Sequence, residues 1–119
     1  MTTIPERLRS DLVAALKSGD GTRTSVLRTA LAALANAEAV DPAGPTVATG
    51  LAGDVARREL TDADVVALLA AERDELREQA AALRARGRSE ADDLDDRAAV
   101  LAAYLPTDER GAAATSHRP

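Results

Sequence analysis

The chain contains no cysteine, phenylalanine or tryptophan, and only one tyrosine and one histidine among its 119 residues. The absence of cysteine excludes a disulfide framework, thiolate ligands for a metal and a cysteine nucleophile. The single histidine, His117, stands in a terminal stretch without apolar periodicity. Nucleophilic catalysis needs a nucleophile, a base and an orienting group. The sequence therefore predicts no catalytic site.

Because aromatic residues are so scarce, a core must consist mainly of leucine, valine and the 28 alanines. Small side chains favour helices that approach one another closely, whereas strands are normally rich in aromatic and β-branched residues. A chain of this length is long enough to bury one core and too short to divide into two. The composition therefore predicts one all-α domain.

Long apolar runs are also missing. Nowhere do 18 uncharged apolar residues stand together, and residues 1–7 lack the apolar stretch of a signal peptide. We therefore expect a cytoplasmic protein with no membrane partner. A net charge of −5 and a pI near 4.8 oppose non-specific binding to nucleic acid, because lysine and arginine supply most of that affinity. Any RNA contact would need a local basic patch.

Capping signals and apolar periodicity predict two helices in the first third of the chain. Residues 3–6, Thr-Ile-Pro-Glu, have the spacing of a capping box and open a helix whose apolar stripe extends to Leu16. Gly19 can end this helix, and Asp20 can cap a second helix over about residues 22–38. The short connection predicts that the two helices are antiparallel, and the thinly charged surface of the second predicts that it is central.

Two further helices are predicted after a glycine- and proline-containing connection at residues 40–54. Thr61 is the expected cap of the third, whose apolar positions include Val66 and Leu69 and which ends at Gly87. Ser89 repeats the capping signal for a fourth, and Pro106 stops it. We predict an antiparallel four-helix domain over residues 1–106 and a disordered tail over residues 107–119.

Other short patterns have structural explanations. The seven glycines are scattered among helix ends and the long connection, whereas a phosphate-binding loop needs them clustered between a strand and a helix. The acidic run at residues 90–96 offers oxygen ligands for a divalent cation, but negative charge also stabilises the start of a helix. We predict no metal site and no cofactor.

Two sets of polar residues are candidates for a functional role. Arginines in and just beyond the last turns of the third helix suit phosphate contacts, although cations also stabilise a helix C-terminus. No aromatic residue interleaves them to stack on bases. This first set is Arg77, Arg84, Arg86 and Arg88. The second set could form an interhelical polar network that specifies register, and it consists of Arg28, Asn36, Glu38 and Glu72.

Several short segments, in their order and spacing, resemble the YqeY family. They are Arg23, Leu27-Arg28, Leu-Ala-Asn-Ala-Glu at 34–38, Glu-Leu-Thr-Asp at 59–62, Glu72, Gly87-Arg88 and Ala-Tyr-Leu-Pro at 103–106. The resemblance spans about residues 4–106, and Tyr-Leu-Pro is its best signature. That family is similar to the C-terminal region of GatB, a subunit of the amidotransferase that converts misacylated Glu-tRNA or Asp-tRNA into Gln-tRNA or Asn-tRNA.

The resemblance implies a non-catalytic, tRNA-associated or amidotransferase-accessory module, with a family-level activity of carbon–nitrogen ligation using glutamine as amido donor. The kinase and amidase sites of that enzyme belong to other domains. Family members continue after Tyr-Leu-Pro with a small second helical domain, most of which we expect to be missing here, because the sequence passes into Gly-Ala-Ala-Ala at 111–114. Two partners stay open: tRNA, through the arginines, or another helical protein.

Overall fold

The computed structural model describes residues 2–39 and 59–106, and the regular structure in these ranges is helical throughout. It consists of α1 (Ile4–Ser18), α2 (Gly21–Glu38), α3 (Asp62–Ala85) and α4 (Glu90–Ala102). The predicted all-α class is confirmed. No helix among the described residues is both long and apolar enough to cross a membrane. The predictions for the connection at 40–54 and for the tail at 107–119 lie outside the described residues.

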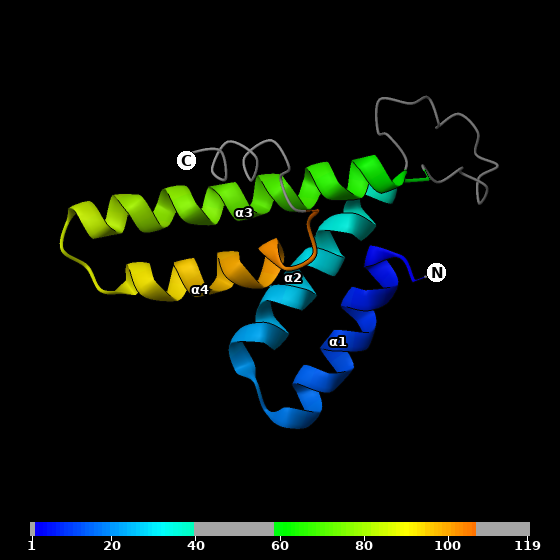
Figure 1. Ribbon diagram of the computed structural model, residues 1–119, viewed down its shortest axis with the longest axis horizontal. Coiled ribbons are helices and arrows are strands. Elements are labelled where there is room, and N and C mark those ends of the chain that lie inside the picture. Colours follow the sequence, from blue (N-terminus) through cyan, green and yellow to red (C-terminus); the bar gives the residue numbers. More distant parts are fainter. Residues whose placement is uncertain (1, 40–58, 107–119) are drawn as a thin grey trace, which may run out of the picture.

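The first two helices form the antiparallel hairpin that the sequence predicts (Figure 1). At the start of α1, the backbone N–H of Glu6 donates to Thr3 Oγ1 at 3.2 Å, and the N–H of Thr3 donates to Glu6 Oε1 at 3.0 Å. Gly19 ends α1 with a φ of 76°, in the left-handed region that a side chain disfavours. The carboxylate of Asp20 then accepts the N–H of Arg23 at 3.0 Å and caps α2.

The second hairpin joins α3 to α4. A capping box between Thr61 and Asp64 opens α3, and both of its hydrogen bonds are 3.0 Å long. Gly87, with a φ of 70°, turns the chain towards α4. The prediction that Ser89 caps α4 is wrong: its backbone, at φ −74° and ψ −13°, is already helical, and its side chain makes no capping hydrogen bond. Three acidic residues in the first turn complement the helix dipole there instead.

The two hairpins cross each other at a steep angle (Figure 1). α3 packs mainly against α4, and α1 mainly against α2, while α2 also contacts both helices of the second hairpin. The prediction that α2 is central is therefore confirmed. The crossing brings the start of α1, the second half of α2 and the start of α3 together on one side of the molecule.

The core lies at this crossing and receives one fully buried leucine from each helix. These leucines are Leu8, Leu27, Leu69 and Leu101, each at most 2% exposed. Burying such a side chain stabilises the fold by about 1.5–3 kcal/mol. Alanines at other contacts let the helices approach closely, as the composition predicts.

The burial of two apolar positions differs from the prediction. Val65 of α3 is buried, and Val66 is only half-buried. Leu16 of α1 is 49% exposed, whereas its neighbour Ala15 is buried, so Leu16 lies on the side of α1 that faces away from the core.

Candidate functional site

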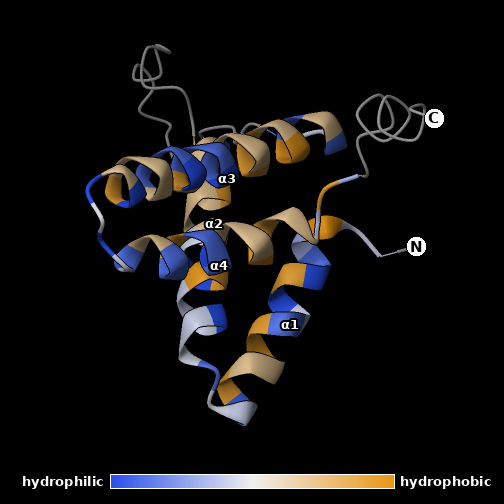
Figure 2. Ribbon diagram, turned by 60° about the vertical axis from the view of Figure 1, so that its left-hand side comes forward, coloured by the Kyte–Doolittle hydropathy of each residue, from blue (hydrophilic) through white to orange (hydrophobic). Residues whose placement is uncertain are grey.

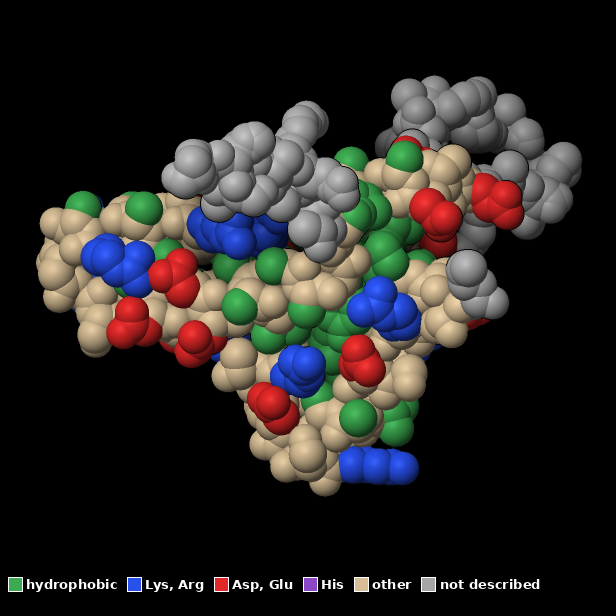
Figure 3. All heavy atoms as spheres, viewed as in Figure 1, with side chains coloured by type: hydrophobic (Ala, Val, Ile, Leu, Met, Phe, Trp, Pro, Cys, Tyr) green, Lys and Arg blue, Asp and Glu red, His purple; other side chains and the backbone are tan. Residues whose placement is uncertain are grey.

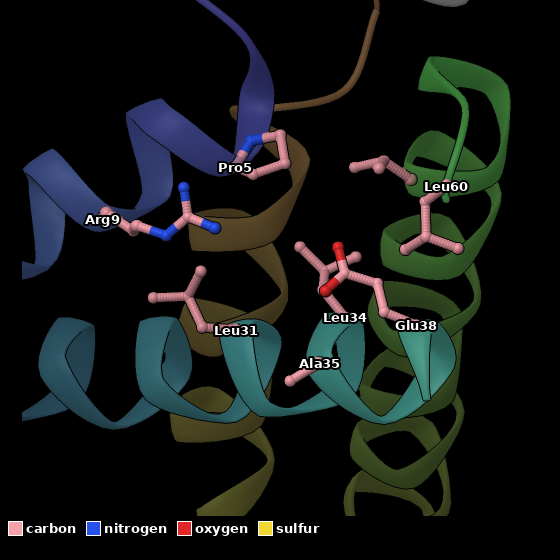
Figure 4. Close-up of a pocket in the computed structure, with 8 residues that line it drawn as sticks. Pro5, Arg9, Leu31, Leu34, Ala35, Glu38 and Leu60 are labelled. Carbon is pink, nitrogen blue, oxygen red and sulfur yellow. The ribbon is translucent and has the colours of Figure 1, made fainter. Parts of the chain in front are cut away.

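A surface cavity of about 370 Å³ opens where α1, α2 and the start of α3 meet (Figure 4). Leu34 and Val65, which are 4% and 3% exposed, belong to its buried lining. More accessible residues complete the lining, namely Pro5, Arg9, Leu31, Ala35, Glu38 and Leu60. Most of these side chains are apolar, which is typical of a binding site.

Two charged side chains reach over the cavity from opposite sides. The guanidinium of Arg9 extends above Leu31, and the carboxylate of Glu38 points into the cavity from the last turn of α2 (Figure 4). Within the described residues, neither group takes part in a hydrogen bond or an ion pair. Both charges are therefore available to a partner that covers the apolar lining.

Two exposed apolar residues lie further along α1, outside the cavity. Val13 and Leu16 are 51% and 49% exposed, the large hydrophobic side chains that stand out on the described surface. They follow Pro5 and Arg9 at helical spacings, so that all four lie on one side of α1. Figure 2 shows hydrophobic turns along α1 and a hydrophilic connection between α3 and α4.

Residues at the same helical spacing on α2 border this side of α1. We define the α1–α2 face as Pro5, Arg9, Val13 and Leu16 of α1 together with Arg28, Leu31, Ala35 and Glu38 of α2. The cavity occupies one end of this face, and the two exposed apolar residues of α1 extend it towards the hairpin turn.

The arginines predicted to contact RNA are all exposed, but two of them are engaged by carboxylates of α4. Arg84 donates to Asp95 at 2.7 Å and to Asp92 at 3.2 Å. Arg88 donates to Glu90 through two nitrogens, at 3.0 and 3.2 Å. The other two arginines of the set, Arg77 and Arg86, have no hydrogen-bond or ion-pair partner among the described residues.

These ion pairs shift the pKa values of charged groups near the connection between α3 and α4. The hydrogen bonds that Arg84 donates to Asp95 and then to Asp92 raise the pKa of its guanidinium, and the hydrogen bond from Arg88 lowers the pKa of the Glu90 carboxyl. Figure 3 shows acidic and basic side chains gathered together at this end. Among the described residues, no group of three acidic or histidine side chains is arranged to hold a metal ion.

The predicted polar network is not hydrogen-bonded in the described part of the chain. Arg28 and Asn36 are exposed, and Glu38 lines the cavity described above. Glu72 is half-buried on α3, where burial and, to a smaller extent, the charge of Glu75 raise the pKa of its carboxyl. No hydrogen bond or ion pair joins these four side chains.

A different polar cluster connects the two hairpins. The hydroxyl of Tyr104, just after α4, donates to a carboxylate oxygen of Asp11 on α1. The guanidinium carbon of Arg7 lies 5.0 Å from the centroid of the Tyr104 ring, within the range of a cation–π contact. Burial, followed by the hydrogen bond to Asp11, raises the pKa of Tyr104 to about 12. Arg97 adds a second link when it donates to Ser25 Oγ on α2 at 3.2 Å.

The family model described as Yqey-like protein matches residues 5–112. The chain belongs to this YqeY-like family. The resemblance inferred from short segments over residues 4–106 is therefore confirmed. No curated protein and no solved structure shows a significant match to the chain.

In this YqeY-like chain, Tyr104 is the tyrosine of the Tyr-Leu-Pro segment, which follows α4. It is 4% exposed and fixes the end of α4 onto α1. Asp11 lies 93 positions earlier in the sequence, so local periodicity gave no signal of this contact. The α1–α2 face was also missed, although Arg9, Val13 and Leu16 form a second stripe at helical spacing.

Proposed function

We propose that this YqeY-like chain is a cytoplasmic, non-catalytic accessory module of the GatB/YqeY type, associated with glutamine-dependent amidotransfer, and that it docks on a helix of another protein. The observation that carries the proposal is the cavity at the crossing of the hairpins. Its lining is apolar, and Arg9 and Glu38 above it have no partner among the described residues.

The surroundings of the cavity favour a helix over a small ligand. A small molecule could fill the cavity, but it would leave Val13 and Leu16 exposed further along α1. An apolar cavity with further exposed apolar residues on the same side of a helix is typical of protein–protein contacts. An amphipathic helix lies lengthwise in such grooves and inserts side chains at intervals of three and four residues.

A photoreactive amino acid placed at position 35 tests the docking proposal inside cells that express the full chain. Position 14 is the matched control, because Ala14 and Ala35 are both exposed alanines of the first hairpin, while position 14 is about 180° around α1 from Pro5. We expect a protein adduct from position 35, retained after nuclease treatment and mapped to a helical segment. Absence of adducts, or equal adducts from both positions, would contradict the proposal.

A tRNA contact is the second candidate, favoured by the two exposed arginines that have no partner among the described residues. Arg77 and Arg86 are free to neutralise phosphates, whereas Arg84 and Arg88 would first have to leave the carboxylates of α4. The net negative charge of residues 59–106, which contain all four arginines, opposes this role, so the protein-docking proposal ranks first.

Salt-titrated binding to total tRNA tests this second candidate. Each phosphate contact contributes about −0.7 to −0.9 to the slope of log affinity against log salt. Changing Arg77 and Arg86 together to Gln should therefore flatten the slope by about 1.5, with Arg84→Gln/Arg88→Gln as the matched control. No binding at low salt, or equal slopes for the wild type and both variants, would exclude these contacts.

A further inference from the structure

We infer that the partner of the α1–α2 face is an acidic amphipathic helix that lies lengthwise between α1 and α2. The inference rests on the proposed docking function and names the chemistry of the partner. Two independent observations support it: the length of the apolar face, and the sign of the charges that remain without partners beside it.

The length of the face sets the length of the partner. Its apolar residues on α1 extend from Pro5 to Leu16, which corresponds to about 16 Å along the helix axis. A partner helix of about 15 residues, or about 22 Å, would cover this distance with a margin of one turn. In the cavity Arg9 lies over Leu31, and α2 runs antiparallel to α1, so that Val13 lies opposite Arg28 one turn further on.

The charges of the first hairpin determine the sign of the partner. Three of its four acidic side chains are used within the chain: Glu6 and Asp20 cap helices, and Asp11 accepts from Tyr104. The basic residues Arg9, Lys17 and Arg28 have no partner in the described part of the chain. Carboxylates on the partner, facing Arg9 and Arg28, would complement this surface, and a base at one end would match Glu38.

Apolar contacts distinguish this partner from RNA. RNA is also acidic, but single-stranded bases need aromatic platforms, and the cavity lining has none. Leucine side chains of an amphipathic helix would instead contact Leu31 and Leu34. The second hairpin is acidic, so it repels an acidic helix and directs it to the α1–α2 face.

Two helical peptides of about 15 residues, each with a fluorescent label and a side-chain cross-link that maintains the helix, test the inference against the full chain. Both carry the same leucine stripe, flanked by glutamates in one peptide and by lysines in the other. In an anisotropy titration we expect the glutamate peptide to bind at least about tenfold more tightly. Ala35→Glu should weaken its binding about tenfold, because the new side chain fills the cavity rim with negative charge, whereas Ala14→Glu should leave it unchanged.

Reversing the charge at position 9 gives a stricter test, because the affinity for one peptide should rise while the affinity for the other falls. Arg9→Glu should weaken the glutamate peptide and strengthen the lysine peptide, while Arg86→Glu, the same change outside the face, should do neither. Circular dichroism checks that all variants fold. Equal binding of both peptides, or equal effects of Arg9→Glu and Arg86→Glu, would overturn the inference.

The cross-linking experiment distinguishes failure of the docking function from failure of the acidic-partner inference. A protein adduct at position 35 that maps to a basic or uncharged helix would leave the docking function standing and overturn the acidic partner. Failure of both the cross-link and the peptides would overturn both.

Discussion

The two helical hairpins differ in their balance of charge. Residues 4–38 contain five basic and four acidic side chains, whereas residues 59–106 contain six basic and twelve acidic ones. In the second hairpin many of these charges meet in ion pairs, such as Arg84 with Asp95 and Arg97 with Asp93. In the first hairpin, no ion pair joins two side chains among the described residues, and three of its four acidic groups cap helices or accept from Tyr104.

This difference shows why the net charge of the whole chain is a poor guide to its partner. A total of −5 suggests a surface that repels anions, yet most of the negative excess belongs to α3 and α4. The first hairpin keeps several basic groups without partners beside exposed apolar residues. Because the two hairpins differ in charge, an acidic partner should be attracted to the first hairpin and repelled by the second.

The largest expected effect tests whether the two hairpins, despite this difference, fold as one unit. Leu69 of α3 is fully buried in the core that all four helices share. Leu69→Ala should cost about 3 kcal/mol, because it leaves a cavity that the helices cannot fill. We expect urea unfolding followed by circular dichroism to show one transition at a lower midpoint.

Leu76→Ala is the matched control for this change. Leu76 lies two turns further along the same helix and is only half-buried, so its truncation should cost clearly less. Two separate unfolding transitions in Leu69→Ala would contradict this expectation and show that the two hairpins fold as independent domains.

The next effect concerns the turn of the first hairpin. Gly19 has a φ of 76°, and a Cβ placed there would meet no atom within 4 Å. Gly19→Ala should therefore cost about 1 kcal/mol through backbone strain alone. Gly21, two residues later inside α2, has no positive φ, so Gly21→Ala should instead stabilise by about 0.5 kcal/mol. Thermal unfolding measures the midpoint temperature of each variant. If both midpoints shift in the same direction from the wild type, this account is wrong.

Sequence information predicted the hairpins because their determinants are local. The capping groups Thr3, Asp20 and Thr61 and the glycines at 19 and 87 act within four residues of themselves. Ser89 had the same local signal but failed, because the turn after Gly87 already places its backbone in the helical region. A capping side chain therefore starts a helix here only where its own backbone is extended, as at Thr3, Asp20 and Thr61.

The candidate site was less predictable because it depends on how the hairpins cross. A helical stripe containing Arg9 and Val13 is visible in the sequence, but which stripe of α1 becomes buried depends on the angle of the second hairpin. The sequence predicts a cluster that includes the arginines at 84 and 88, but their pairing with carboxylates of α4 depends on the antiparallel return of the chain. Contacts between distant residues, such as Tyr104 with Asp11, carry no periodic signal.

An effect of similar size is expected where the two hairpins are joined. Tyr104→Phe removes the hydrogen bond to Asp11 and should cost about 1 kcal/mol. The pKa of Tyr104 is raised from about 10 to about 12, so the folded state holds the phenolic proton more tightly than the unfolded state. This contribution to stability is complete below pH 10 and is lost as the pH rises through about 12.

Because Tyr104 is the sole tyrosine, the absorbance of tyrosinate reports its ionisation directly. We expect a titration midpoint near 12 in the folded chain and near 10 in urea. Stability should fall more steeply above pH 10 in the wild type than in Tyr104→Phe. A midpoint near 10 in the folded chain would show that the tyrosine hydroxyl is solvated and that another contact joins the hairpins.

The smallest effect concerns the ion pairs that set the second hairpin apart. Arg84 bridges Asp92 and Asp95 on an exposed surface, where solvent and salt screen the interaction. Arg84→Gln should lower the urea midpoint slightly at low salt, and the difference should vanish near 1 M NaCl, where the Debye length falls to about 3 Å. Arg86→Gln is the control, because Arg86, at the C-terminus of the same helix, has no ion-pair partner among the described residues, so its loss should lower the midpoint less than the loss of Arg84. A deficit for Arg84→Gln that persists at high salt would mean that Arg84 holds α3 to α4 by packing, since screening leaves such contacts unchanged.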